Sequence, residues 1–152
     1  MIYSIFNHTK QMKILMILGQ KSLTLPFAGK FFSVFFEYLI RIFFGSDISC
    51  EATISRDITF IHGHDIVIGS NVIIGKQCKI FNGVTLGNKD TEIGYNEHPI
   101  IGENCIISTG AKILGKIYIG DNSIIGANAV VLKDVPCNSI AVGVPAKNIP
   151  KK

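Results

Sequence analysis

Large aliphatic residues recur at every sixth position along most of this chain. The spacing slips once by two positions, between Ile66 and Ile68. The full series is Ile48, Ile54, Phe60 and Ile66, then Ile68, Ile74, Ile80 and Leu86, and finally Ile101, Ile107, Ile113, Ile119, Ile125 and Val131. A period of six fits neither an amphipathic helix, which repeats every 3.6 residues, nor a simple alternating strand. It predicts short strands joined by sharp corners, with one large side chain per repeat turned into a shared core.

Such repeats stack so that each turn of chain buries the apolar edge of its neighbour, and we therefore predict an all-β repeat domain over residues 47–152. One polar segment, residues 87–99, interrupts the period. It is rich in turn-forming residues, which indicates a loop extruded from one corner.

Residues 1–46 lack the period and predict a short helical cap. Helices are expected over residues 10–22 and 30–44, separated by Pro26 and Gly29, with Glu37 and Arg41 one turn apart on the second helix. We expect the aromatic residues of the cap to pack on the first coil or on a second subunit. The alternative is peripheral contact with a membrane surface through the basic, Phe-rich face of the cap.

Composition narrows the classes of protein that remain. A length of 152 residues favours one domain, and 47% hydrophobic residues exclude a disordered chain. The net charge of +4 lies entirely in residues 1–46, which hold five basic residues and one acidic residue, so we expect no nucleic-acid partner. The four cysteines form no CxxC pair, and no apolar run is long enough to span a membrane. We expect reduced thiols and a cytoplasmic protein, with the inner face of the membrane as the alternative site.

The six-residue period resembles that of the hexapeptide-repeat acyltransferases. This resemblance covers about residues 45–149 and implies a left-handed parallel β-helix with three repeats in each triangular turn. The hand is taken from the resemblance alone, because the usual rule for parallel strand connections favours the opposite hand.

Two histidines, His62 and His64, lie where the period slips. Irregular positions in a regular scaffold often turn a side chain outward, and a neutral imidazole beside a carboxylate is a good base for a hydroxyl proton. Asp47 precedes His62 by fifteen residues. On coils of eighteen residues we expect the two on neighbouring rungs about 5 Å apart, with Asp47 orienting the ring.

The segments FGSDISCEATI, FIHGHDIVIG, EHPIIGENCIISTGAKILG and VGVPAKN resemble the serine acetyltransferase group. The resemblance places the family's catalytic base at His62, its orienting aspartate at Asp47 and its acceptor-binding histidine at His98. We also expect Glu97 and His64 to line the acceptor site. Two residues depart from the family pattern, because Ile61 replaces an acid and Glu97 replaces the arginine that helps to bind the carboxylate of serine.

The same resemblance implies an acetyl-CoA site built largely from small residues. Thr109, Gly110 and Ala111 form one corner, where small side chains leave room for an extended pantetheine arm. Gly87, Gly126 and Ala127 are expected to line the same groove. Three lysines, Lys112, Lys133 and Lys147, are expected to meet the CoA phosphates as point charges.

We therefore expect an acetyl-CoA-dependent O-acetyltransferase without a metal, and the family resemblance further implies a homotrimer with active sites between subunits. Because Glu97 would repel a carboxylate, and because the short cap resembles small acetyltransferases of the colanic-acid type, we expect a sugar hydroxyl of a surface polysaccharide as the acceptor. Three alternatives stay open. They are L-serine acetylation for cysteine synthesis, a zinc carbonic anhydrase that uses His62, His64 and His98, and a non-enzymatic scaffold.

Overall fold

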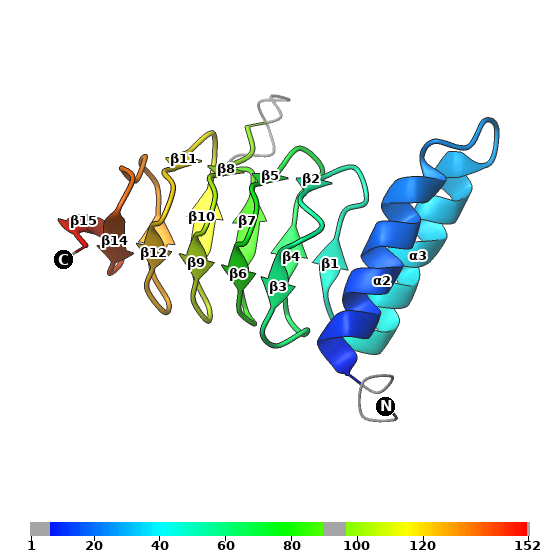
Figure 1. The fold of residues 1–152 in the computed structure, drawn as a ribbon, viewed down its shortest axis with the longest axis horizontal. Coiled ribbons are helices and arrows are strands. Elements are labelled where there is room, and N and C mark those ends of the chain that lie inside the picture. The colour runs from blue at the N-terminus through cyan, green and yellow to red at the C-terminus, as the bar shows by residue number, and fades with distance from the viewer. Residues whose placement is uncertain (1–6, 90–96, 152) are drawn as a thin grey trace.

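The computed structural model describes residues 7–89 and 97–151 of the chain. A hairpin of two helices, α2 (His8–Ser22) and α3 (Gly29–Phe44), stands at one end of a stack of short strands (Figure 1). The side chain of Asn7 caps α2 by accepting a hydrogen bond from the backbone of Lys10, and Gly45 ends α3 in the left-handed conformation that glycine adopts without strain. The strands begin at Asp47, directly after this stop.

Three parallel sheets form the sides of a triangular prism, which is the left-handed β-helix that the hexapeptide resemblance predicts. The first sheet contains β1 (Asp47–Ile48), β4 (Val67–Ile68), β7 (Thr85–Gly87), β10 (Lys112–Leu114) and β13 (Val130–Val131). The second sheet contains β2 (Thr53–Ile54), β5 (Ile73–Ile74), β8 (Ile100–Ile101) and β11 (Tyr118–Ile119). The third contains β3 (Thr59–Phe60), β6 (Lys79–Ile80), β9 (Ile106–Ile107), β12 (Ile124–Ile125), β14 (Ser139–Val142) and the antiparallel β15 (Lys147–Pro150). The chain visits the three sheets in turn, so each circuit is one coil.

The core of the prism is the six-residue series itself. Most of these strands expose or half-expose their first residue and bury their second, as the alternation of a strand requires. Every member of the predicted series, including Ile66 beside the slip, is buried in one continuous cluster. The prediction of short strands around a shared aliphatic core is confirmed.

The corners between the second and third sheets depend on residues in the left-handed conformation. Gln77, Asn104, Asn122 and Asn138 stack there in successive coils with φ between 55° and 58°. Each of the three asparagines donates its backbone N–H to a carbonyl of the preceding coil at 2.9 Å. Asparagine visits this conformation more readily than most residues, so it serves at these corners in place of glycine.

The pairing register accounts for the two interruptions seen in the sequence. Asp47 pairs with Val67, twenty residues on, whereas Val67 pairs with Thr85 after eighteen. The first coil therefore holds two additional residues, at the slip that contains His62 and His64. The predicted extruded loop at 87–99 falls largely on residues 90–96, which lie outside the described residues.

The helical cap closes the open end of the first coil. Met12, Met16, Ile40 and Phe44 are buried in the core cluster. Lys13 donates to the carbonyl of Ile58 at 2.7 Å, and Gln20 donates to that of Ala52 at 2.8 Å. Within residues 7–89 and 97–151, no helix has the length and apolar character needed to cross a bilayer.

Candidate active site

One edge of the prism, where the chain passes from the third sheet to the first, gathers most of the predicted chemistry. We call it the histidine edge and define it as residues 61–66, 82–84, 109–111 and 126–129. Backbone bonds join its levels: Gly83 donates to His64 at 3.4 Å, Gly110 donates to Asn82 at 2.9 Å, and Asn128 donates to Thr109 at 2.9 Å. The predicted base and part of the predicted donor site therefore lie along one line of the molecule.

His62 and His64 are both exposed on this edge, as the register slip predicts. Their ring centroids lie 6.4 Å apart, and the ring of His62 also meets the edge of Phe81 at 6.4 Å. No hydrogen bond joins the His62 ring to another described residue. The ring is therefore free to meet a substrate hydroxyl.

The first coil is longer than the eighteen-residue coil on which the expected position of His62 relative to Asp47 was based. The twenty-residue first coil puts Val67 directly above Asp47, so His62 does not stand on the facing rung. The Asp47 carboxylate instead accepts a hydrogen bond from Arg41 at 2.8 Å, and this contact raises the pKa of the Arg41 guanidinium. Both side chains are more than half exposed, and such surface pairs typically contribute less than about 1 kcal/mol, so Asp47 can exchange this partner at little cost.

Glu37 and Arg41 of α3 make contacts with the first coil that the sequence did not predict. The two residues lie one turn apart on α3, a spacing at which opposite charges are neighbours on a helix surface. Glu37 instead accepts a hydrogen bond from the backbone of Cys50 at 2.7 Å, while Arg41 turns to Asp47. Burial together with the Glu37 carboxylate raises the pKa of Cys50 to about 12. Both side chains thus take their hydrogen-bond partners from the first coil.

His98 lies on the opposite edge of the first sheet, in the connection from β7 to β8. Its ring packs on Gly69, where an added Cβ would come within 2.5 Å of ring atoms Cδ2 and Nε2. Nδ1 of His98 is buried and has no hydrogen-bond partner among the described residues. Sequence reasoning missed Gly69, because a glycine at a corner is already explained by coil geometry.

The small residues of the predicted donor site divide between the two edges. Thr109, Gly110, Gly126 and Ala127 lie on the histidine edge, whereas Gly87 ends β7 at the edge near His98. Gly110 has a φ of +74°, and its Cα faces Asn128 so closely that any Cβ would overlap the amide oxygen. The side chain of Ala111 is buried in the core, so only its backbone is available to a ligand.

The three predicted phosphate-binding lysines are scattered in a single chain. Nζ of Lys112 donates to Gly83 O at 2.6 Å and to Thr85 Oγ1 at 3.0 Å, so it is held against the first sheet. Lys133 is exposed in the connection after β13, and Lys147 is exposed on β15. The structure does not bring these three amines together.

The structure also places the two residues that depart from the family pattern, Glu97, which is a predicted acceptor residue, and Ile61. Glu97 is exposed next to His98, and Ile61 is half-buried at the start of the histidine edge. Among the described residues, no group of three or more His, Cys, Asp or Glu side chains is placed to hold a metal ion.

The chain matches two family models of repeat proteins. Residues 98–133 match the bacterial transferase hexapeptide family of six repeats, and residues 65–89 match the hexapeptide repeat of succinyl-transferase. Both matches lie within the β-helix.

Its relatives among known proteins include several serine acetyltransferases. The one from Bacillus subtilis is 46% identical over 107 residues, which cover 70% of this chain and 49% of the relative. The one from Helicobacter pylori strain J99 is 44% identical over 113 residues, covering 74% and 66%. A solved structure, the serine acetyltransferase of Neisseria gonorrhoeae, superposes with a TM-score of 0.87 at 33% identity, covering 95% of this chain and 55% of that one. The chain spans about half the length of most of these relatives.

These matches overturn one expectation from the sequence. The predicted acceptor, a sugar unit of a surface polysaccharide, was wrong, because the relatives and the structural neighbours are consistently serine acetyltransferases. That expectation rested on Glu97, Ile61 and the length of the cap. For the identity of the acceptor, differences at Glu97 and Ile61 are weaker evidence than sequence similarity that extends over about 110 residues.

Proposed function

Because this chain belongs to the serine acetyltransferase-like hexapeptide-repeat proteins, we propose that it is an acyltransferase that moves the acetyl group of acetyl-CoA to the hydroxyl of L-serine. The observation that carries the proposal is the exposed ring of His62, which has no hydrogen-bond partner among the described residues and shares one edge of the prism with the small residues Thr109, Gly110, Gly126 and Ala127. A solved structural neighbour, a serine acetyltransferase in complex with CoA, lends support to the donor (TM-score 0.77, 34% identity, covering 93% of this chain and 55% of that one).

The reaction is a direct transfer without an acyl-enzyme. A ring nitrogen of His62 takes the proton of the serine hydroxyl while the oxygen attacks the thioester carbonyl. The carbon–sulfur bond then breaks, the serine oxygen keeps the acetyl group, and the CoA sulfur leaves with the proton that His62 carried. A backbone N–H near Gly87 stabilises the negative charge on the carbonyl oxygen.

We assign Asp47 the role of orienting His62 once substrate is bound. In the free chain Asp47 pairs with Arg41, and exchange of that weak surface pair for the imidazolium is inexpensive because both partners stay solvated. A carboxylate beside the protonated ring stabilises the charge that forms during transfer.

His98, Glu97 and His64 form the acceptor side in this proposal. Nδ1 of His98 is buried without a described partner, and a serine polar group offers it one. Glu97 repels a carboxylate but attracts an ammonium group, so we assign it to the amine end of serine.

The distribution of these residues supports a homotrimer. His62 and His98 lie on different edges of the first sheet, so neither edge of one chain holds both. Three chains in a closed ring bring the histidine edge of each against the His98 edge of the next, and the contact repeats three times. Gly87 of one chain then joins Thr109, Gly110 and Ala127 of its neighbour in one donor groove. In that assembly Lys112, Lys133 and Lys147 are candidates to meet the CoA phosphates.

We expect the reaction in the cytoplasm. All four cysteines are free thiols, three of them buried, as is usual in a reducing compartment.

The test is acetyl transfer from acetyl-CoA to L-serine, followed by release of the CoA thiol. We expect His62→Ala to lower kcat by about 10²- to 10⁴-fold, the usual contribution of a general base. The matched control is His8→Gln, which replaces a histidine of the helical cap whose ring packs on Phe44. We expect this variant to keep the wild-type kcat.

Two results would overturn the proposal. One is a wild-type protein that transfers no acetyl group to serine and does not bind CoA, as the scaffold alternative requires. The other is a His62→Ala variant with an undiminished rate.

A further inference from the structure

Helix α3 buries Ile40 and Phe44 in the core, and on its opposite side it exposes a row of large apolar side chains. Ser33 is buried and its carbonyl accepts from the Cys50 thiol, while Glu37 and Arg41 reach the first coil through Cys50 and Asp47. The large apolar side chains on the other side are exposed, and they are Phe31, Phe32, Val34, Phe35, Tyr38, Ile42 and Phe43. A helix that only covers a core turns its apolar residues inward and its polar residues to solvent. The exposed apolar side of α3 therefore calls for a separate explanation.

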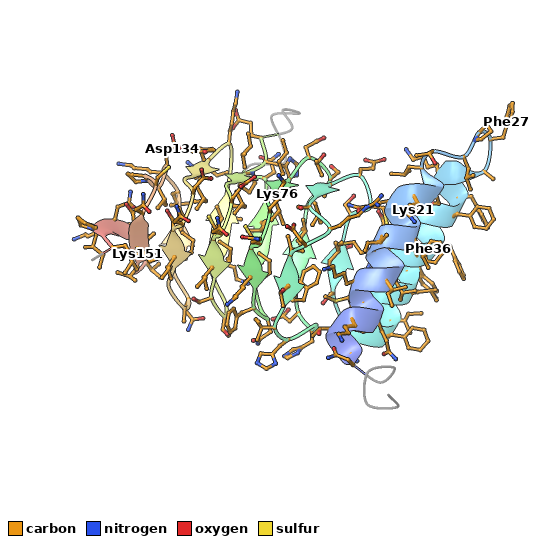
Figure 2. The ribbon with its side chains drawn as sticks, viewed as in Figure 1. Lys21, Phe27, Phe36, Lys76, Asp134 and Lys151 are labelled. Carbon is orange, nitrogen blue, oxygen red and sulfur yellow. The ribbon has the colours of Figure 1, made fainter. Side chains whose placement is uncertain are left out.

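These side chains form a continuous stripe, which we call the aromatic face and define as Phe27, Phe31, Val34, Phe35, Tyr38 and Ile42. The spacing of four or three residues places them on one side of α3, and the stripe extends for about 22 Å. Phe31 keeps 73% of its surface exposed. The face lies at the end of the molecule, away from the β-helix (Figures 1 and 2).

Phe27 carries this face past the end of the helix. It sits in the turn between α2 and α3, fully exposed, and Figure 2 shows it at the tip, pointing away from the strands. Its φ of 65° is in the left-handed region, which a bulky residue rarely occupies. A strained backbone that holds a phenyl ring out in water favours a role for the ring outside the chain.

The described residues of the cap, 7–46, carry a net positive charge. The one acidic residue among described residues 7–46 is Glu37, and its carboxylate is turned to the backbone of Cys50. Lys21 is exposed beside the α2–α3 turn region, next to Leu25 and Phe32. Lys30 is 84% exposed and forms a surface ion pair with Glu51 at 3.8 Å, a contact that is weak because solvent screens it.

We propose that the aromatic face docks this protein on the surface of a bilayer that contains anionic phospholipid. Helix α3 lies in the plane of the headgroups, the rings enter the acyl boundary, and Lys21 and Lys30 meet the phosphates. A lipid surface suits the protruding Phe27 better than a folded partner does, because a soft acyl layer admits a ring without a preformed pocket. This inference concerns the cap alone and does not depend on the acetyl transfer proposed above.

Flotation of the full chain with phosphatidylglycerol–phosphatidylcholine vesicles tests the proposal. We expect the triple variant Phe27→Ser/Phe31→Ser/Phe35→Ser to lower the vesicle partition coefficient by at least about tenfold, since it removes three exposed rings from the face. Ile73→Ser/Ile100→Ser, which removes exposed apolar residues from the second sheet, is the matched control and leaves binding unchanged. Lys21→Ala/Lys30→Ala weakens binding to anionic vesicles and leaves the weaker binding to pure phosphatidylcholine unchanged.

Molar mass and serine acetylation in solution are measured on the same samples. The proposal is overturned if the wild-type chain does not float with anionic vesicles, or if the triple variant floats as well as the control. It is also overturned if the triple variant loses molar mass while the wild type ignores vesicles, because a second copy of the chain then covers the face. Acetylation without vesicles stays unchanged in the triple variant, so a failure of docking and a failure of the proposed catalysis give different results.

Discussion

The position of the His98 ring depends on the missing side chain at Gly69. The ring lies where a Cβ of residue 69 would stand, 2.5 Å from two of its atoms. In the proposed reaction this contact makes Gly69 a positioning residue, since it touches the acceptor histidine and not the substrate.

At the residue scale we therefore expect Gly69→Ala to displace the ring and raise the KM for serine by about tenfold, equivalent to about 1.4 kcal/mol of acceptor binding. The smaller effect is expected on the KM for acetyl-CoA. Steady-state kinetics with each substrate varied in turn measures both.

A double-mutant cycle separates this role from a general disturbance of the coil. When His98 is already alanine, adding Gly69→Ala should cost nothing more, because the ring that it displaces is gone. An equal loss in both backgrounds would show that Gly69 acts through the backbone of the prism instead.

Single residues also mark the limit of what the sequence could predict about the site. The exposure of His62 and His64 follows from the register slip, which is visible in the spacing of the aliphatic residues. The partner of Asp47 does not follow from it, because the two additional residues in the first coil shift the rung above Asp47 to Val67. Arg41, from a helix that carries no repeat, takes that carboxylate.

At the scale of elements, the corners determine the fold as much as the strands do. Most strands hold only two residues, so the direction of the chain is set by the turn that follows each of them. The aliphatic period predicted the strands and the core. The left-handed asparagine column was not predicted, since only glycine was considered for the corners.

The asparagine corners lead to a stability prediction. We expect Asn122→Ala to lower the free energy of unfolding by about 1–2 kcal/mol, the cost of the left-handed conformation for a residue with a Cβ and no local hydrogen bond. Asn122→Gly is the matched control and costs much less, because glycine adopts this conformation freely.

Urea unfolding of the two variants measures the difference. Equal stabilities for alanine and glycine at this position would contradict the assignment of strain to the corner. The residue is exposed, so neither substitution removes core packing.

At the scale of the whole molecule, the two histidines on opposite edges are the strongest argument for assembly. The sequence predicted that His62 and His98 act together, but nothing in the spacing could place them on separate edges of one sheet. Only the three-dimensional course of the coils shows that a single chain presents them to different sides.

Subunit mixing tests the assembly. His62→Ala and His98→Ala chains, each of low residual activity alone, should regain part of the wild-type activity when refolded together, because some sites then combine an intact His62 from one chain with an intact His98 from the next. Co-refolding each variant with itself is the control. Mixtures that stay as inactive as the single variants would place both histidines of a site in one chain.

The pairing register on either side of the β7–β8 connection shows that the β-helix tolerates an insertion there. Ile73 pairs with Ile100, twenty-seven residues on, whereas Ile100 pairs with Tyr118 after only eighteen, yet the ladder above and below this step is unbroken. This coil therefore contains nine more residues than the next one, and the strands on either side of it still pair in register. The segment that leads into His98 can therefore change in length and sequence during evolution while the paired strands keep their register. In the proposed function such a change would alter the acceptor side of the site and leave the β-helix in place.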